Sequence, residues 1–272
     1  MKSLQSSAPI LAALSAAALL AACGGSSDSN NDGTGTGTMR LSLTDAPACG
    51  YESAFVTVEK VRVHQSGSAG DNDSGWHEVV LAAPQRIDLL TLNNGTLLPL
   101  GQTELPAGTY TQLRLVLAPN TAAAPLANAV TPIGGSATAL TTPSGQQSGL
   151  KANVNLTVPA GQVADFAIDF DACKSFVKAG NSGRVLLKPV LAVIPILSTA
   201  GQRIVGFVAP ALANAGTAVS AQSAGHPVRA TSPDAAGPFV LYPVDVGNSD
   251  LVITAGGRVN AVMTGAPVSG TA

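Results

Sequence analysis

The sequence predicts an all-β protein, an antiparallel β-sandwich followed by a second, smaller β-sandwich. Three observations predict this class. Short segments alternate apolar and polar residues with a period of two, which is typical of half-buried strands. Turn-forming residues separate these segments, and the chain holds 29 glycines and 18 prolines. No long segment has the apolar spacing of a helix, and the one helical candidate is a turn or two at 173–178.

The first predicted strands show the alternation and one interruption of it. Leu41 and Leu43 share one face of a strand. In the segment 54–64, Val56 and Val58 have one phase, whereas Val61 and Val63 have the other. Such a change of phase at 59–60 predicts a β-bulge or a bend.

The strands of the middle region follow the same period. In the segment 110–117 we expect three leucines to point inward and Gln112 and Arg114 to point outward. The segment 152–158 repeats the pattern, and 164–170 places three apolar residues opposite Asp165 and Asp169. The run 185–197 is nearly continuous in apolar residues, which predicts a strand covered on both faces. Pro189 and Pro195 interrupt it and suit bends or edges.

The organisation of the chain follows from these segments. We expect a signal peptide at 1–22, a tether at 23–38, a first sandwich at 39–198 and a second at 199–272. The number and length of the strands are typical of immunoglobulin-like or transthyretin-like sandwiches.

The N-terminal segment predicts export and lipidation. Lys2 precedes an uncharged stretch at 8–22, which has the length of a signal-peptide core and is too short to span a bilayer as a helix. Leu20-Ala21-Ala22-Cys23 resembles a bacterial lipobox, in which Cys23 is acylated and becomes the new N-terminus. Several acyl chains on one residue anchor a protein stably. No acidic residue follows Cys23, which by enterobacterial sorting rules favours the outer membrane, with the body facing the periplasm or the cell surface.

Composition excludes some partners and suggests a disulfide. The net charge is −2, only 11% of residues are charged, and no basic run occurs, so nucleic-acid binding is not expected. Besides Cys23, the chain has two cysteines, Cys49 and Cys173. Two thiols in an oxidising compartment usually pair, so we expect a disulfide between them.

Two family resemblances add to this prediction. The blocks "LTDAP", "GTYTQLRL" and "LKPVLAV", within about 39–196, resemble the bacterial lipoprotein family called domain of unknown function 4382. That resemblance implies extracytoplasmic β-structure and no defined activity. The tail resembles carboxypeptidase regulatory-like, transthyretin-like sandwiches through "IVGFV" at 204–208, "TAVSA" at 217–221 and "DAAGPF" at 234–239, although the aromatic expected after Gly247 is absent. Such modules are non-catalytic appendages.

Catalytic and metal motifs are weak throughout. The sequence has no G-x-S-x-G, no H-E-x-x-H and no C-x-x-C, and its three histidines are scattered. The segment 71–76, "DNDSGW", begins like a calcium loop but departs from the EF-hand pattern at its fifth, sixth and twelfth positions. A looser site built from Asp165, Asp169 and Asp171 is the remaining metal candidate, and the alternative is that these residues form the solvated side of a strand.

Sugar binding needs exposed aromatic side chains beside polar groups. Tyr51, Trp76 and Tyr110 are the candidates, and core packing is the alternative for each. We therefore predict a lipoprotein without enzymatic activity or cofactor, attached to the membrane through its lipid, with a role in binding, adhesion or envelope structure. The second hypothesis is a carbohydrate-binding lipoprotein of a polysaccharide-handling system, with a glycan or an envelope protein as partner. A hydrolase without a local motif is the third.

Overall fold

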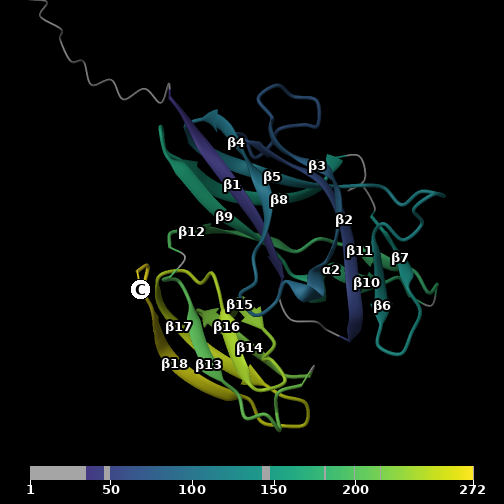
Figure 1. Ribbon diagram of the computed structural model, residues 1–272, viewed down its shortest axis with the longest axis vertical. Coiled ribbons are helices and arrows are strands. Elements are labelled where there is room, and N and C mark those ends of the chain that lie inside the picture. The colour runs from purple at the N-terminus through teal and green to yellow at the C-terminus, as the bar shows by residue number, and fades with distance from the viewer. Residues whose placement is uncertain are drawn as a thin grey trace, which may run out of the picture. The chain divides into compact units, whose positions relative to one another are not determined.

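A computed structural model describes residues 35–45, 50–142, 148–180, 182–198, 200–214 and 216–271 (Figure 1). Gly33–Ala272 form one compact unit. The predicted signal peptide, Cys23, most of the predicted tether and Cys49 lie outside the described residues.

The fold is all-β and consists of layered sheets, as the sequence predicts. One sheet of the first sandwich has the order β12-β9-β1-β4, formed by Leu191–Ile196, Val163–Phe170, Thr36–Asp45 and Leu98–Pro106. The other has the order β10-β11-β7-β6-β2-β5-β8, formed by Phe176–Lys178, Val185–Leu187, Thr138–Thr141, Ala129–Pro132, Tyr51–His64, Gly108–Leu117 and Leu150–Val158, and β3 (His77–Asp88) also pairs with β2. Most neighbouring strands are antiparallel, but β1 pairs with β9 and β7 with β11 in parallel, so the sheets are mixed.

Strand β1 begins earlier than predicted. Thr36 and Gly37, assigned to the tether from sequence, pair with Pro106 and Leu105 of β4. A Cβ at Gly37 would lie 2.3 Å from the Pro159 carbonyl oxygen, so only glycine allows the chain to approach that closely. Because this segment has few apolar residues, its sequence pattern does not predict a strand, although backbone pairing with β4 stabilises one there.

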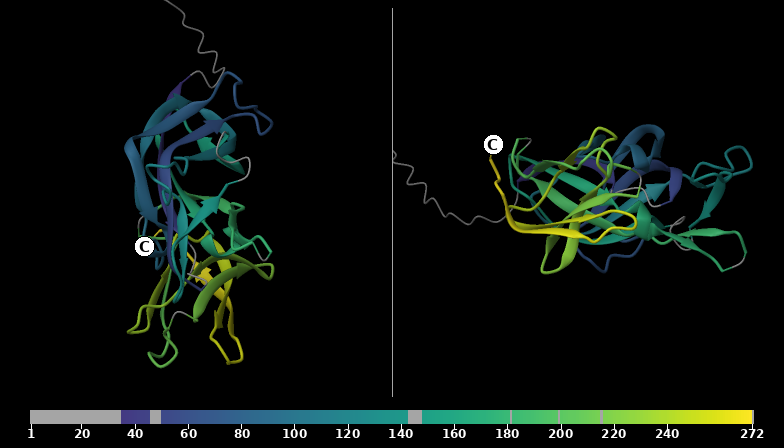
Figure 2. Two further views of the ribbon diagram at one scale, coloured as in Figure 1. Left: turned by 90° about the vertical axis from the view of Figure 1, so that its right-hand side faces the viewer. Right: turned by 90° about the horizontal axis from the view of Figure 1, so that it is seen from below.

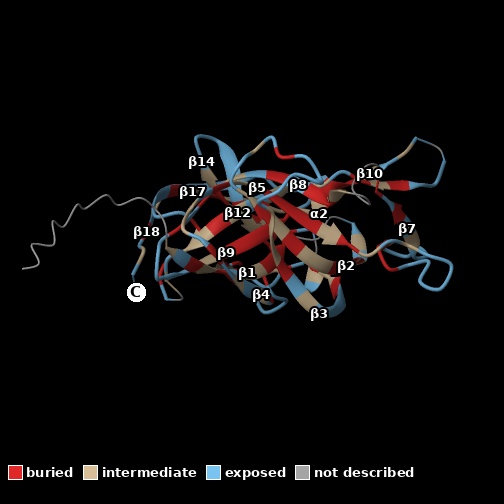
Figure 3. Ribbon diagram, turned by 90° about the horizontal axis from the view of Figure 1, so that it is seen from above, coloured by how far each residue is buried: buried red, intermediate tan, exposed pale blue. Residues whose placement is uncertain are grey.

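The predicted periodicity holds in the core. Met39, Leu41 and Leu43 of β1 are fully buried, and Phe166 and Phe170 of β9 pack in the same cluster (Figure 3). Burying each such side chain contributes about 1.5–3 kcal/mol. The predicted bulge in β2 is confirmed, because pairing of β2 with both β3 and β5 shifts register between Val58 and Lys60.

Two residues expected to face solvent from β5 are instead buried. Gln112 is 0% and Arg114 5% exposed. The loop between β2 and β3 folds over them, and the backbone carbonyl of Ala69 accepts from the Gln112 amide at 3.3 Å and from Arg114 Nη2 at 2.9 Å. Asp71 also pairs with Arg114. Alternation identified the face correctly, but it does not show that a distant loop covers this face.

The apolar run 185–197 is two strands rather than one. β11 and β12 belong to different sheets, and Pro189 lies in the connection between them. Pro195 lies on β12, an edge strand whose one partner among the described strands is β9. The predicted helical turn at 173–178 is confirmed only in its first half, as α2 (Ala172–Ser175), because 176–178 form strand β10. A 3-10 turn, η1 (Leu89–Thr91), follows β3.

The second sandwich contains a two-stranded and a four-stranded sheet. The first pairs β13 (Ile204–Phe207) with β16 (Pro238–Leu241), and the second has the order β15-β14-β17-β18, formed by His226–Thr231, Ala218–Ser223, Gly247–Thr254 and Ala261–Val268. These strands gather at the lower end of the left-hand view in Figure 2. Their buried apolar residues, among them Val219, Phe239 and Leu241, form a core cluster separate from that of the first sandwich.

Candidate functional site

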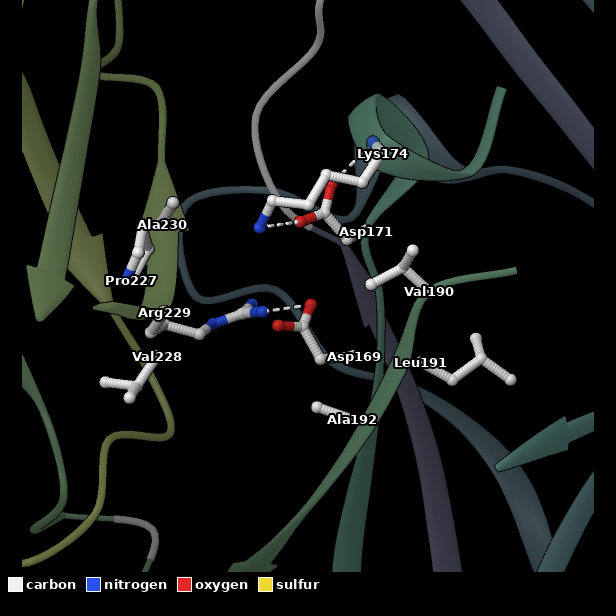
Figure 4. A pocket seen from close by; sticks show the side chains of 10 residues that line it. All are labelled: Asp169, Asp171, Lys174, Val190, Leu191, Ala192, Pro227, Val228, Arg229 and Ala230. Atoms are coloured by element: carbon white, nitrogen blue, oxygen red, sulfur yellow. Dashed lines mark hydrogen bonds and ion pairs between the residues drawn. The ribbon is translucent and has the colours of Figure 1, made fainter. Parts of the chain in front are cut away.

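A small crevice lies where β9, α2 and β12 of the first sandwich meet β15 of the second (Figure 4). Its volume is about 120 Å³. Four charged residues line it: Asp169, Asp171, Lys174 and Arg229. Contacts between domains are frequent places for ligand sites, so this crevice is the first candidate.

Asp169 and Arg229 form a buried ion pair across the crevice. Their side chains point toward each other in Figure 4, and the residues are 7% and 3% exposed. Arg229 Nη2 also donates to Thr44 Oγ1 at 2.6 Å and to the Asp45 carbonyl at 3.3 Å. Within its own sandwich, Arg229 Nε donates to the Tyr242 carbonyl at 3.2 Å. One guanidinium thus joins two neighbouring strands of one sheet of the first sandwich, β1 and β9, to the second sandwich.

The environment of Asp169 opposes its ionisation. Burial raises the pKa of the Asp169 carboxyl, and the nearby Asp171 charge acts in the same direction. Arg229 lowers the pKa but does not fully offset the burial. Burying this ion pair between the two sandwiches therefore carries a cost in desolvation.

Asp171 has a local structural role. Its Oδ1 accepts from the Lys174 backbone N–H at 3.0 Å and caps α2, and its Oδ2 lies 2.7 Å from Lys174 Nζ. The crevice therefore contains two carboxylates, each paired with a cation. This arrangement is nearly neutral and suits a clasp between sandwiches better than a site that captures a charged ligand.

The three metal candidates do not converge. Asp165 lies farther along β9, where Arg40 Nη2 donates to its Oδ2 at 2.7 Å. Asp169 and Asp171 bind Arg229 and Lys174 as described above. Across the described ranges, no group of three or more histidine, cysteine, aspartate or glutamate residues is arranged to hold a metal ion.

The aromatic candidates are separated and mostly packed. Tyr110 is fully buried, and its hydroxyl donates to the Pro106 carbonyl at 2.8 Å, which resembles the tyrosine corner of β-sandwiches. Tyr51 packs edge-on against Phe176, with ring centroids 5.5 Å apart. These two rings stabilise the fold and do not form a sugar platform together.

Trp76 closes the loop between β2 and β3. The guanidinium carbons of Arg62 and Arg114 lie 4.4 and 4.6 Å from its ring centroid, and its Nε1 donates to the Gly70 carbonyl at 2.9 Å. These cation-π contacts occupy the ring. Trp76 therefore anchors this loop over Gln112 and Arg114.

One of the two cysteines of the predicted disulfide lies beside the crevice. Cys173 lies in α2, next to Asp171 and the crevice. Because Cys49 falls outside the described residues, the predicted disulfide stays a prediction. If formed, it would link the segment between β1 and β2 to α2.

A second contact between the sandwiches centres on Asn94. Its backbone N–H donates to Thr231 Oγ1 at 2.8 Å, and its amide donates to Asp234 Oδ1 at 3.0 Å. The Val240 backbone N–H donates to Asn94 Oδ1 at 2.6 Å. Asn94 has a φ of 54°, a conformation that asparagine tolerates better than most residues.

Sequence reasoning identified neither Arg229 nor Asn94 as functional. The dipeptide Asn94-Gly95 is typical of a turn, but its sequence does not show that Asn94 also contacts the second sandwich. Arg229 carries one available signal, since it is an isolated charge in a second sandwich that has few charges. No helix within the part of the chain that the structure describes has the length and apolar character to cross a membrane.

These features define an all-β protein in which two sandwiches of unequal size are clasped by buried polar contacts. A family model described as domain of unknown function (DUF4382) matches residues 36–189, more than half of the chain. The chain belongs to this family. No curated protein and no solved structure shows significant similarity to it.

Proposed function

We propose that this protein is a lipid-anchored extracytoplasmic protein with a non-catalytic role in binding, adhesion or envelope structure. In this proposal Cys23 carries the lipid, and the two sandwiches form one rigid body that is presented beyond the membrane surface. The observation that carries the proposal is the buried Asp169–Arg229 ion pair, because it links the two sandwiches and would hold them in one orientation.

The second sandwich supports the same role. Its resemblance to carboxypeptidase regulatory-like modules implies an appendage without catalytic activity. The contacts of Asn94 and Arg229 fix this appendage to the DUF4382 domain instead of leaving it on a flexible linker. A rigid pair loses less conformational entropy on binding than two mobile domains would.

Rigidity is tested by the distance between the sandwiches. Spin labels attached at Lys151→Cys and Arg258→Cys, both exposed positions, would report the distance between the two sandwiches by double electron–electron resonance. We expect a narrow distribution in the wild-type background and a broad one with Arg229→Met. A broad distribution in the wild-type background would contradict the rigid-body proposal.

The anchor is tested in a bacterial host. We expect the wild-type chain to sediment with membranes and Cys23→Ala to remain in the soluble extracytoplasmic fraction. Cys173→Ala is the matched control, since it removes a cysteine and should leave the anchor in place. Membrane association of Cys23→Ala would disprove lipidation at this residue.

Binding activity is tested by screening the full chain with Cys23→Ala against envelope and plant-type glycans, with and without calcium. Saturable glycan binding would support the carbohydrate-binding hypothesis, and turnover of a glycoside or ester would support the hydrolase hypothesis. Absence of both glycan binding and turnover would contradict these two hypotheses and leave the leading proposal.

A further inference from the structure

The small β13–β16 sheet has two edges with different surroundings. The β16 edge faces the first sandwich, where Asn94 Oδ1 accepts the Val240 N–H at 2.6 Å. The β13 edge pairs with no other strand among the described residues. One edge is therefore closed by the first sandwich, and the other is open.

Backbone geometry shows which groups the open edge presents. In an antiparallel pair, residues alternate between exchanging hydrogen bonds with the partner strand and pointing those groups away from it. Val208 N–H bonds to the Gly237 carbonyl, and the Val240 N–H turns outward to Asn94. Val205 pairs with Val240, and Phe207 pairs with Pro238, which has no N–H. The N–H and C=O groups of Val205 and Phe207 therefore point away from β16.

An apolar groove runs beside this open edge. It has a volume of about 490 Å³ between β13 and the four-stranded sheet, and Arg203 is the only charged residue among those that line it. Val205, Phe207, Val262 and Met263 are each 61–65% exposed. Proteins usually protect such edges with charges, and β13 has none.

We propose that this edge is a self-association surface, where β13 pairs antiparallel with β13 of a second copy about a two-fold axis at Gly206. In this register Val205 lies opposite Phe207 of the second copy, and Phe207 lies opposite its Val205. Both members of each pair present outward N–H and C=O groups, so each pair can exchange two hydrogen bonds. The exposed valine and phenylalanine side chains also meet as an aromatic and β-branched cross-strand pair.

The surface is compatible with its own copy in charge. Antiparallel pairing about Gly206 places the two Arg203 residues six positions apart, about 20 Å along the strands, so they do not repel strongly. A two-fold contact must be self-complementary, and this hydrogen-bond register meets that condition without another protein.

The groove is small for a stable dimer. Thirteen residues line it, whereas a standard interface uses roughly 20–30 residues on each side. We therefore expect a reversible dimer with a Kd of roughly 1–100 µM in solution.

Sedimentation velocity of the full chain with Cys23→Ala tests the proposal across concentrations from about 1 to about 300 µM. We expect the mass to rise from monomer to dimer. Val205→Lys should keep the chain monomeric over that range. Val80→Lys is the matched control because Val80 is also 65% exposed on an edge strand, β3, and this change should leave the dimer intact.

A second experiment tests the register. Chains with Val205→Cys and chains with Phe207→Cys are mixed and oxidised, and we expect a mixed cross-linked dimer in excess of either self-linked product. A chain that stays monomeric throughout, a dimer that Val205→Lys leaves unchanged, or occupation of this edge by a different protein would overturn the proposal. Circular dichroism of each variant establishes that it is folded.

Discussion

The two sandwiches differ in how each closes its core. The first surrounds a large cluster of buried apolar residues, including ten or more that are 0–1% exposed. The second has nine buried apolar residues in its cluster and a groove along one edge. The second also uses Asn94 of the first sandwich to cover its β16 edge. A small unit with few core residues gains stability when polar groups of a larger neighbour form hydrogen bonds with its exposed sheet edge.

The largest expected effect separates the two cores. Phe170→Ala in the first sandwich and Phe239→Ala in the second each remove a ring that is at most 4% exposed, and each should cost its own core about 3–5 kcal/mol. Trp76, the only tryptophan, reports the first sandwich. We expect Phe170→Ala to shift the urea transition of Trp76 fluorescence strongly. Phe239→Ala should shift it little while lowering the midpoint of the far-UV circular dichroism transition. Equal fluorescence shifts would show that the two cores unfold as one.

The next comparison is between two ion pairs on strand β9, the buried Asp169–Arg229 pair and the exposed Asp165–Arg40 pair. Arg229→Met leaves Asp169 buried without its cation, which should cost about 3–5 kcal/mol. Arg40→Met removes the partner of Asp165, but Arg40 is 53% exposed in its side chain, so we expect only about 0–1 kcal/mol. Urea denaturation followed by circular dichroism measures both. Similar costs would mean that the Asp169–Arg229 pair does not hold the sandwiches together.

The Asn94 contact should have a smaller effect. Asn94→Gly keeps the positive φ accessible but removes two side-chain hydrogen bonds to the second sandwich. We expect a loss of roughly 1–3 kcal/mol in the free energy of unfolding. Asn72→Gly, in an exposed loop, is the control and should change stability by less than about 0.5 kcal/mol. If Asn94→Gly changes the stability as little as Asn72→Gly does, Asn94 does not stabilise the second sandwich.

The smallest effect concerns pH. Because burial raises the pKa of Asp169, the native state binds a proton more readily than the unfolded chain does. The stability linked to that proton is present below the unfolded value of about 3.9 and is lost as pH rises through the native pKa. We therefore expect the wild type to gain stability relative to Asp169→Asn as pH falls from 7 toward about 4. The comparison uses urea midpoints at several pH values, and the opposite slope would mean that Arg229 outweighs burial.

Local pattern predicted much of the first sandwich. The alternation of Leu41 with Leu43 indicated their buried face, and the change of phase at 59–60 indicated the bulge in β2. Both features depend on neighbours in the chain, so sequence contains them. Gln112 and Arg114 show the limit of this reasoning, because their polarity predicted solvent and a loop more than forty positions away in the chain supplies their partners instead.

By itself the sequence determined the class of fold, the position of most strands and the existence of a second sandwich, because strand period and turn chemistry are local. Only the tertiary structure decided how the sandwiches meet. Asp169 and Arg229 lie sixty positions apart, and neither residue's neighbours indicate the other. The same holds for the open β13 edge, since a strand's sequence shows which face is apolar but not whether another strand covers its backbone. Pairing across long separations depends on the topology of the whole chain, and the candidate site and the proposed association surface depend on that pairing.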